Sequence, residues 1–173
     1  CMTYSSGFRS ANRAELAREV LMRVADEAGD EEDSPIYRDP KQPAVDRPGA
    51  IPAQLQEFAR NAVQRALAQP GGLERALGEC LTEPKSNVWF EPAEAMQMLE
   101  GVVLDRRTRM MYDERHVFIN GDSYRAGGRD ATLMRRLADQ RFLTAADLAR
   151  ASDDALELLS AWCETGWAHP GPQ

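Results

Sequence analysis

Hydrophobic positions in the first third of the chain recur at helical spacing. The first block follows Asn12, and one stripe of it is formed by Leu16, Val20 and Val24. Asn12 is a favourable N-cap residue with a glutamate three positions later, and Gly29 is a natural residue to end a helix. The pattern therefore predicts a helix from Arg13 to Ala28.

Two more helices are predicted before residue 85. Apolar residues recur every three to four positions from Leu55 to Leu67, and Pro52 is expected at the first helical position. After a Pro-Gly-Gly break, a shorter helix is expected to end before Pro84. Its inward-facing residues are predicted to be Leu73, Leu77, Cys80 and Leu81. Wide apolar faces without a sheet to cover them indicate a bundle that completes its core with a second copy of the chain.

The segment 29–50 between the first two helices has a different composition. An acidic run at residues 30–33 is followed by prolines at positions 35, 40, 43 and 48. Proline at this density blocks both helix and sheet, so we expect a solvated connection. An acidic contact surface is the alternative.

Residues 1–9 alternate in a manner typical of a strand, with Thr3 and Ser5 on one face and Tyr4 and Phe8 on the other. So short a strand needs partners, and the sequence offers none nearby. The chain also begins with Cys1 rather than methionine. We therefore expect a sheet upstream and interpret the chain as part of a longer protein.

The second half of the chain mixes short strands with helices. A short helix is predicted over Pro92–Glu100. The predicted strands, which we expect to form a small antiparallel sheet, are Val102–Leu104, Arg109–Tyr112, His116–Ile119 and Ser123–Arg125. Asn120-Gly121 is a strong hairpin signal, because both positions of the turn require positive φ. The predicted later helices are Asp130–Gln140, Thr144–Ala151 and Asp153–Thr165. Thr144 and Asp147 resemble a capping box, and Ser152 is expected to cap the last helix, with Asp153 and Asp154 in its first turn. This order is typical of a winged-helix-like unit, and the overall fold class is α+β, mostly α.

Charge and composition narrow the function. The 173 residues carry 21 lysines and arginines against 28 aspartates and glutamates, a net charge of −7. This balance argues against a dedicated nucleic-acid binder, whose affinity comes largely from neutralised phosphates. No apolar stretch is long enough to span a membrane. The cysteines, odd in number and far apart, are interpreted as reduced thiols of a cytoplasmic protein.

The sequence shows no catalytic or metal site of its own. It has only two histidines, His116 and His169, and no cysteine pair with metal-ligand spacing. We expect His116 to be a surface or rim residue. The residues that we expect to serve core packing or interface contact are Trp89, Trp162 and Trp167. We expect Cys80 and Cys163 to pack as small hydrophobic residues on apolar helix faces.

A winged-helix pattern raises the hypothesis of DNA binding. The candidate recognition helix Ala145–Arg150 offers one arginine and one aspartate, a poor set for reading bases. Arginines are frequent around the small sheet, but neighbouring carboxylates largely offset them. We expect a structural or partner-contacting role, and a DNA-binding regulator with a helical dimerisation arm is the alternative.

Several motifs, in order, resemble bacterial ribosomal oxygenases, which are JmjC/cupin-type protein hydroxylases. The motifs are Met2-Thr3-Tyr4-Ser5-Ser6-Gly7-Phe8-Arg9, Asn12-Arg13-x-Glu15-Leu16, Leu81-Thr82-Glu83-Pro84-Lys85, Phe118-Ile119-Asn120-Gly121 and Trp162…Gly166-Trp167. The resemblance implies that residues 1–11 are the last strand of a missing cupin barrel. It further implies a helical dimerisation region over residues 12–85 and a winged-helix-like domain over residues 86–173.

The resemblance also implies chemistry for the parent protein. Such enzymes use Fe(II) and 2-oxoglutarate, and bacterial members typically hydroxylate an arginine of a large-subunit ribosomal protein. Their His-x-Asp…His metal triad would lie upstream of Cys1, so this chain is expected to be inactive alone and to bind no cofactor. Thr3 and Ser5 are the candidate cosubstrate-binding residues, with barrel filling as the alternative. The expected partners are a second copy of the chain and a ribosomal protein.

Overall fold

The computed structural model describes residues 12–30, 34–40, 47–92, 101–125 and 127–171. The chain forms two compact units, residues 1–76 and 77–173, which we describe separately. The unit boundary lies inside a helix, earlier in the chain than the domain boundary that the sequence predicts after residue 85. The predicted strand 1–9 and most of the predicted helix Pro92–Glu100 lie outside the described residues.

The first unit contains the helices α1 (Arg13–Gly29) and α2 (Ala53–Leu67) and the start of α3 (Gly72–Thr82). The predicted cap of α1 is confirmed, because the Asn12 side chain accepts a hydrogen bond of 2.9 Å from the Glu15 backbone N–H. Pro52 is the N-cap residue of α2 and not its first helical residue. Its fixed φ suits this position as well, because no N–H is needed there.

Contacts within the first unit join α1, α2 and the connection between them. The ring of Tyr37 packs edge-on against Phe58 of α2, with ring centroids 5.5 Å apart. At the start of α3, Arg75 forms an ion pair with Glu27 of α1. The residues 34–40 of the connection are thus held to α2 by an aromatic contact.

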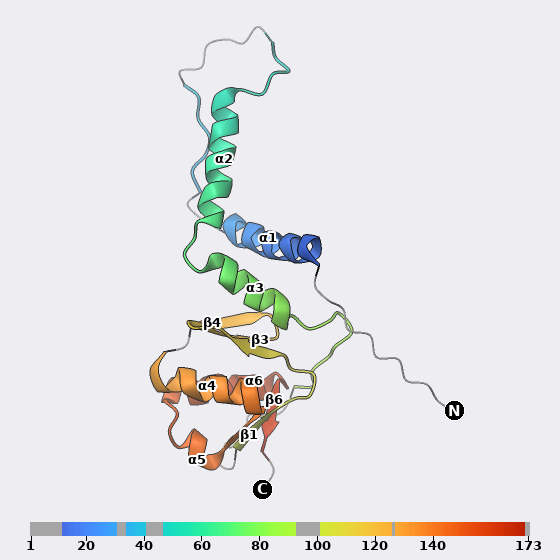
Figure 1. The fold of residues 1–173 in the computed structure, drawn as a ribbon, viewed down its shortest axis with the longest axis vertical. Helices are drawn as coiled ribbons and strands as arrows, with labels where there is room; N and C mark the ends of the chain where they lie inside the picture. Colours follow the sequence, from blue (N-terminus) through green and yellow to red (C-terminus); the bar gives the residue numbers. More distant parts are fainter. Residues whose placement is uncertain (1–11, 31–33, 41–46, 93–100, 126, 172–173) are drawn as a thin grey trace, which may run out of the picture. The chain divides into compact units, whose positions relative to one another are not determined.

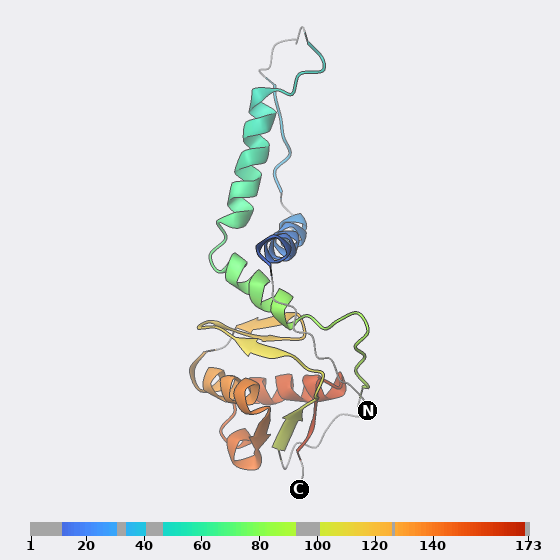
Figure 2. The same cartoon turned by 45° about the vertical axis from the view of Figure 1, so that its right-hand side comes forward.

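The described residues of the second unit form two small antiparallel sheets with helices between them (Figures 1 and 2). Its first sheet contains β2 (Met110–Tyr112), β3 (His116–Ile119) and β4 (Asp122–Arg125). The second contains β1 (Gly101–Leu104), β5 (Phe142–Thr144) and β6 (Ala168–Pro170). The helices are α4 (Gly128–Gln140), α5 (Ala145–Leu148) and α6 (Asp153–Glu164).

The hairpin β3–β4 confirms the predicted Asn-Gly turn. Asn120 and Gly121 have φ values of 49° and 96°, and Phe118 pairs with Ser123 across the two strands. Strand β3 is buried on both faces. Val117 and Ile119 join the core with α4 and α6, whereas Phe118 faces Gly78 of α3.

The sheet β5–β1–β6 differs from the prediction. Strand β1 does not join the other predicted strands; it lies between β5 and β6, with Val102 opposite Leu143 and Val103 opposite His169. Strands β5 and β6 have three residues each and no periodic signal that the sequence could reveal. The interpretation of one small sheet was therefore wrong.

The predicted inward face of α3 is also partly wrong. Leu73 and Leu81 are 42% and 41% exposed, whereas Gly78 and Thr82 are buried. Small residues form the buried face here because they allow the helix backbone to approach the hairpin closely. In the part of the chain that the structure describes, no helix is both long and apolar enough to cross a membrane.

Candidate binding surfaces

The predicted cosubstrate residues Thr3 and Ser5 lie outside the described residues. The two histidines are not brought together. His116 on β3 has its Nδ1 3.4 Å from a carboxylate oxygen of Asp113, and His169 on β6 has its Nε2 3.0 Å from one of Asp105. Within the described ranges, no group of three or more potential ligands could hold a metal ion. These residues therefore do not fit the two-histidine, one-carboxylate triad of an Fe(II) oxygenase.

The Asp105 carboxylate stabilises the turn that follows β1. It accepts hydrogen bonds from the backbone N–H and the guanidinium of Arg107, at 2.8 and 2.9 Å. The Arg107 side chain holds the pKa of Asp105 well below its ordinary value. Arg141, at the end of α4 with a positive φ of 65°, donates to the carbonyls of Asp105 and Thr108. Together these bonds fix the turn after β1.

The structure corrects the prediction of a recognition helix over Ala145–Arg150. It is a helix of only four residues, α5, and its aspartate is structural. Asp147 is buried, accepts from the Thr144 hydroxyl and backbone N–H, and forms an ion pair of 2.7 Å with Arg136. A capping box thus fixes Asp147, and it is not available to a partner.

In a helix–turn–helix arrangement the second helix enters the major groove with its N-terminal residues. Here that helix is α6, which begins at Asp153 and is capped by the Ser152 hydroxyl. The acidic residues of α6 are Asp153, Asp154, Glu157 and Glu164, and the helix contains no lysine or arginine. A helix surface of this charge repels phosphates.

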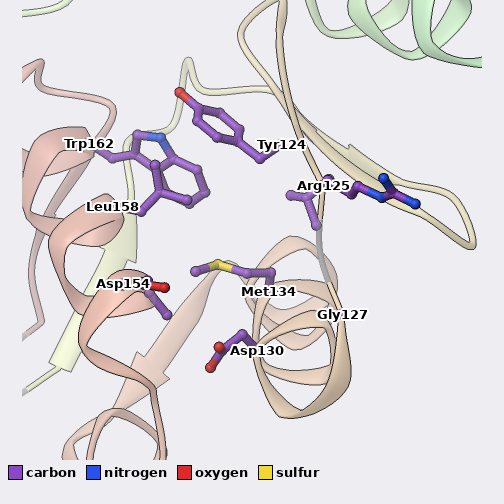
Figure 3. A pocket seen from close by; sticks show the side chains of 10 residues that line it. Tyr124, Arg125, Gly127, Asp130, Met134, Asp154, Leu158 and Trp162 are labelled. Atoms are coloured by element: carbon purple, nitrogen blue, oxygen red, sulfur yellow. The ribbon is translucent and has the colours of Figure 1, made fainter. Parts of the chain in front are cut away.

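A hollow of about 180 Å³ lies between the β3–β4 hairpin, α4 and α6 (Figure 3). Its apolar lining includes Val117, Tyr124, Met134, Leu158 and Trp162. The rings of Tyr124 and Trp162 meet edge-on, with centroids 5.5 Å apart. Trp162 is 2% exposed and belongs to the core, so the aromatic wall of the hollow is rigidly backed.

The charged groups of this hollow are two aspartates and one arginine. The Asp130 carboxylate accepts from the Ser152 backbone N–H at 3.1 Å and from its hydroxyl at 2.7 Å, which lowers the pKa of Asp130. Asp154 is exposed, and among the described residues its carboxylate has no hydrogen-bond or ion-pair partner. The Arg125 guanidinium points away from the hollow in Figure 3.

Sequence reasoning missed the hollow. The sequence predicts Asp154 only as a favourable first-turn residue of α6, and it predicts Trp162 only in core packing or interface contact. Their spacing on α6, together with Leu158, places them on one side of that helix. No sequence signal shows that the hairpin and α4 leave this side partly open.

The remaining tryptophans and cysteines occupy different environments. Trp167 packs against Phe90, with ring centroids 6.4 Å apart, whereas Trp89 is 76% exposed. The prediction that Cys163 packs as a small hydrophobic residue is confirmed. It lies in the core, and burial raises the pKa of its thiol to about 11.

Helix α2 carries an apolar stripe that its own unit leaves exposed. Leu55, Val63 and Leu67 are 37%, 59% and 37% exposed, and no residue of α2 is buried. The other apolar side of α2 contacts its own unit through Phe58. A second apolar stripe exposed on a helix is a typical surface for a partner.

Two comparisons identify what this chain is similar to. The family model for the ROXA-like winged helix matches residues 64–169. No curated protein sequence gives a significant match.

Solved structures of a ribosomal oxygenase, YcfD from Escherichia coli, have a similar fold. One crystal structure shares 23% identity and a TM-score of 0.66, over 93% of this chain. Complexes of YcfD with cobalt and succinic acid, and with cobalt and 2-oxoglutarate, each give a TM-score of 0.68, at 22% and 23% identity over 94% and 93% of this chain. The matched region is 46% to 47% of each YcfD chain, so this chain spans about half the length of these relatives.

Proposed function

This chain belongs to the ROXA-like winged-helix family, and from that membership we propose that it is the C-terminal part of an Fe(II)- and 2-oxoglutarate-dependent ribosomal protein hydroxylase. The observation that carries the proposal is the fold similarity to YcfD along nearly the whole chain, over less than half of that ribosomal oxygenase. The complexes of YcfD with cobalt and 2-oxoglutarate support a metal- and 2-oxoglutarate-dependent parent.

In this proposal, the chemistry resides outside the described residues. Residues 1–11 are the last strand of the catalytic barrel, with Thr3 and Ser5 beside the cosubstrate. The first unit pairs with a second copy of the chain. The exposed stripe of Leu55, Val63 and Leu67 supports this pairing, because a dimer interface would cover it.

The proposed substrate is an arginine of a large-subunit ribosomal protein in the cytoplasm. Ribosomal proteins that bind RNA are basic, and this chain has a net charge of −7. Complementary charge would speed the encounter between enzyme and substrate. Helix α6 is acidic, and its charge favours a basic protein as the partner over DNA.

The direct test is hydroxylation by the full-length gene product. With Fe(II), 2-oxoglutarate and purified large-subunit ribosomal proteins, we expect succinate release and a mass gain of one oxygen atom on one arginine. The 173-residue chain alone, with the same additions, is expected to show no turnover. Turnover by this chain alone, or a full-length protein that hydroxylates no ribosomal protein, would contradict the proposal.

The alternative, a DNA-binding regulator, has its own test. Binding to random duplex DNA, measured at low and at moderate salt, would show a steep loss with salt for such a protein. We expect no binding at either salt concentration. A steep salt dependence would favour the regulator.

A further inference from the structure

We propose that the hollow between the β3–β4 hairpin, α4 and α6 binds one arginine side chain of a basic protein segment. The identity of that segment as part of a ribosomal protein rests on the proposed function. The binding itself rests on the size, lining and charge of the hollow.

The size of the hollow selects a single side chain. Its volume of about 180 Å³ is below the ~300 Å³ at which pockets for cofactors and other small molecules begin. It is comparable to one large side chain, and protein interfaces are often anchored by one aromatic or arginine residue that fills such a pocket. The core behind it is fixed, since Trp162 is almost fully buried.

The charge of the hollow selects a cation. Asp130 is held in place by two hydrogen bonds from Ser152, and Asp154 has a carboxylate without a partner among the described residues. The one arginine in the lining, Arg125, directs its guanidinium away, as Figure 3 shows. Asp153 and Glu157 add negative charge on exposed positions of the same helix. A cationic side chain is attracted by the Asp154 carboxylate, whereas an anionic side chain is repelled by it.

The lining favours arginine over lysine. A guanidinium is planar, stacks on aromatic rings and bonds a carboxylate through two N–H groups, whereas an ammonium is a compact and strongly hydrated charge. The Tyr124 ring provides an aromatic edge of the hollow, and Asp154 provides the carboxylate. Met134 and Leu158 provide apolar contacts for the three methylene groups of an arginine.

The test compares two neighbouring aspartates in the full-length protein. The probe is a synthetic peptide of arginines separated by glycines, titrated by calorimetry. Asp154→Asn removes the carboxylate that lines the hollow, and we expect the affinity to fall about tenfold, since a hydrogen bond to a charged group is lost. Asp153→Asn is the matched control, because it makes the same change one residue earlier on α6, and we expect less than about a twofold effect.

Peptide variants identify the group that is bound. Replacing each arginine by citrulline keeps the shape and removes the charge, and we expect binding to be lost. Replacement by lysine is expected to weaken binding. The indole N–H resonance of Trp162 is expected to shift with the arginine peptide, to shift less with the lysine peptide at the same concentration, and not to shift with the citrulline peptide. Equal losses for the two aspartate variants, equal binding of the citrulline peptide, or no binding of the arginine peptide would overturn the inference.

Two further readouts separate this inference from the proposed function. If the protein hydroxylates a ribosomal protein but Asp154→Asn binds the arginine peptide as the wild type does, the inference is wrong and the function stands. If the protein hydroxylates no ribosomal protein but its arginine binding depends on Asp154, the inference about the hollow is supported and the proposed function is wrong. If Asp154→Asn changes self-association and leaves peptide binding unchanged, the hollow is a contact between copies and the inference is overturned.

Discussion

At the scale of single residues, the close contact between Gly78 and Phe118 constrains the packing of α3 on the hairpin sheet. A Cβ atom at position 78 would lie 2.4 Å from the Phe118 ring, closer than packed atoms approach. Phe118 is 2% exposed, so its ring has little space into which to move. The absence of a side chain at this point allows α3 to cover the outer face of β3.

Gly78→Ala is therefore expected to destabilise the second unit, although alanine favours helices over glycine by nearly 1 kcal/mol. Overpacking of this kind typically costs about 1–3 kcal/mol. Chemical denaturation followed by tryptophan fluorescence reports on this unit, because Trp89, Trp162 and Trp167 all lie in it.

Gly127→Ala is the control within the same unit. Gly127 is exposed at the start of α4 with an extended φ of −138°, and a Cβ there would meet nothing within 4 Å. Its fluorescence transition is expected to be unchanged. A Gly78→Ala protein as stable as the wild type would show that Phe118 can move aside.

At the scale of elements, the turn between β1 and β2 links parts of the chain that are distant in sequence. Thr108 donates its hydroxyl hydrogen to the Trp167 carbonyl at 2.7 Å, and Asp105 donates its backbone N–H to the same carbonyl. Arg141 and His169 bond to the turn from α4 and β6. The Asp105 carboxylate contributes the contacts with His169 and Arg107.

This turn predicts a component of acid sensitivity. Because the pKa of Asp105 is lowered in the folded protein, the unfolded chain binds a proton there more readily. The stabilisation is complete well above pH ~4, the ordinary aspartate range, and is lost as the pH falls below it. We expect Asp105→Asn to lower the free energy of unfolding by about 1–3 kcal/mol at neutral pH and by less in acid.

The measurement is the free energy of unfolding from neutral pH to about pH 2, compared for wild type and variant. Glu114→Gln removes an exposed carboxylate and serves as the control, with a pH profile parallel to that of the wild type. Parallel profiles for Asp105→Asn and wild type would show that the turn does not need the ionised carboxylate.

The elements predicted correctly from the sequence are those with local signals. The Asn120-Gly121 turn and the caps at Asn12, Thr144 and Ser152 each depend on bonds between near neighbours, and all four are confirmed. Strands β5 and β6 were not predicted, because three residues are too few to show a periodic pattern. Both strands are stabilised by pairing with β1, which lies far away in the sequence. The hollow was not predicted either, because its lining residues come from four elements, β3, β4, α4 and α6, that only the fold brings together.

At the scale of the whole molecule, the proposed division of roles depends on the exposed stripe of α2. Val63 is the most exposed of its three large residues. A charge placed there would be buried in any dimer that covers the stripe, at a cost of several kcal/mol. Val63→Glu is therefore expected to shift the full-length protein from dimer to monomer in sedimentation.

Gln64→Glu provides the control, because it adds the same charge at the next position, beside the stripe and not within it. It is expected to leave the dimer intact. A Val63→Glu protein that remains dimeric would place the interface elsewhere, and a monomeric wild type would contradict the pairing itself.

The position of β1 also has a consequence for biosynthesis. This strand is the middle of its sheet, yet it is made before both neighbours, and the second of them ends only at Pro170. A nascent chain leaving the ribosome therefore carries β1 with both edges open until β5 (Phe142–Thr144) has been made, and with one edge open until β6 is complete. An open strand edge of this kind is prone to aggregation. The sheet β5–β1–β6 is completed only when β6 has been made, which makes this unit a candidate client for molecular chaperones.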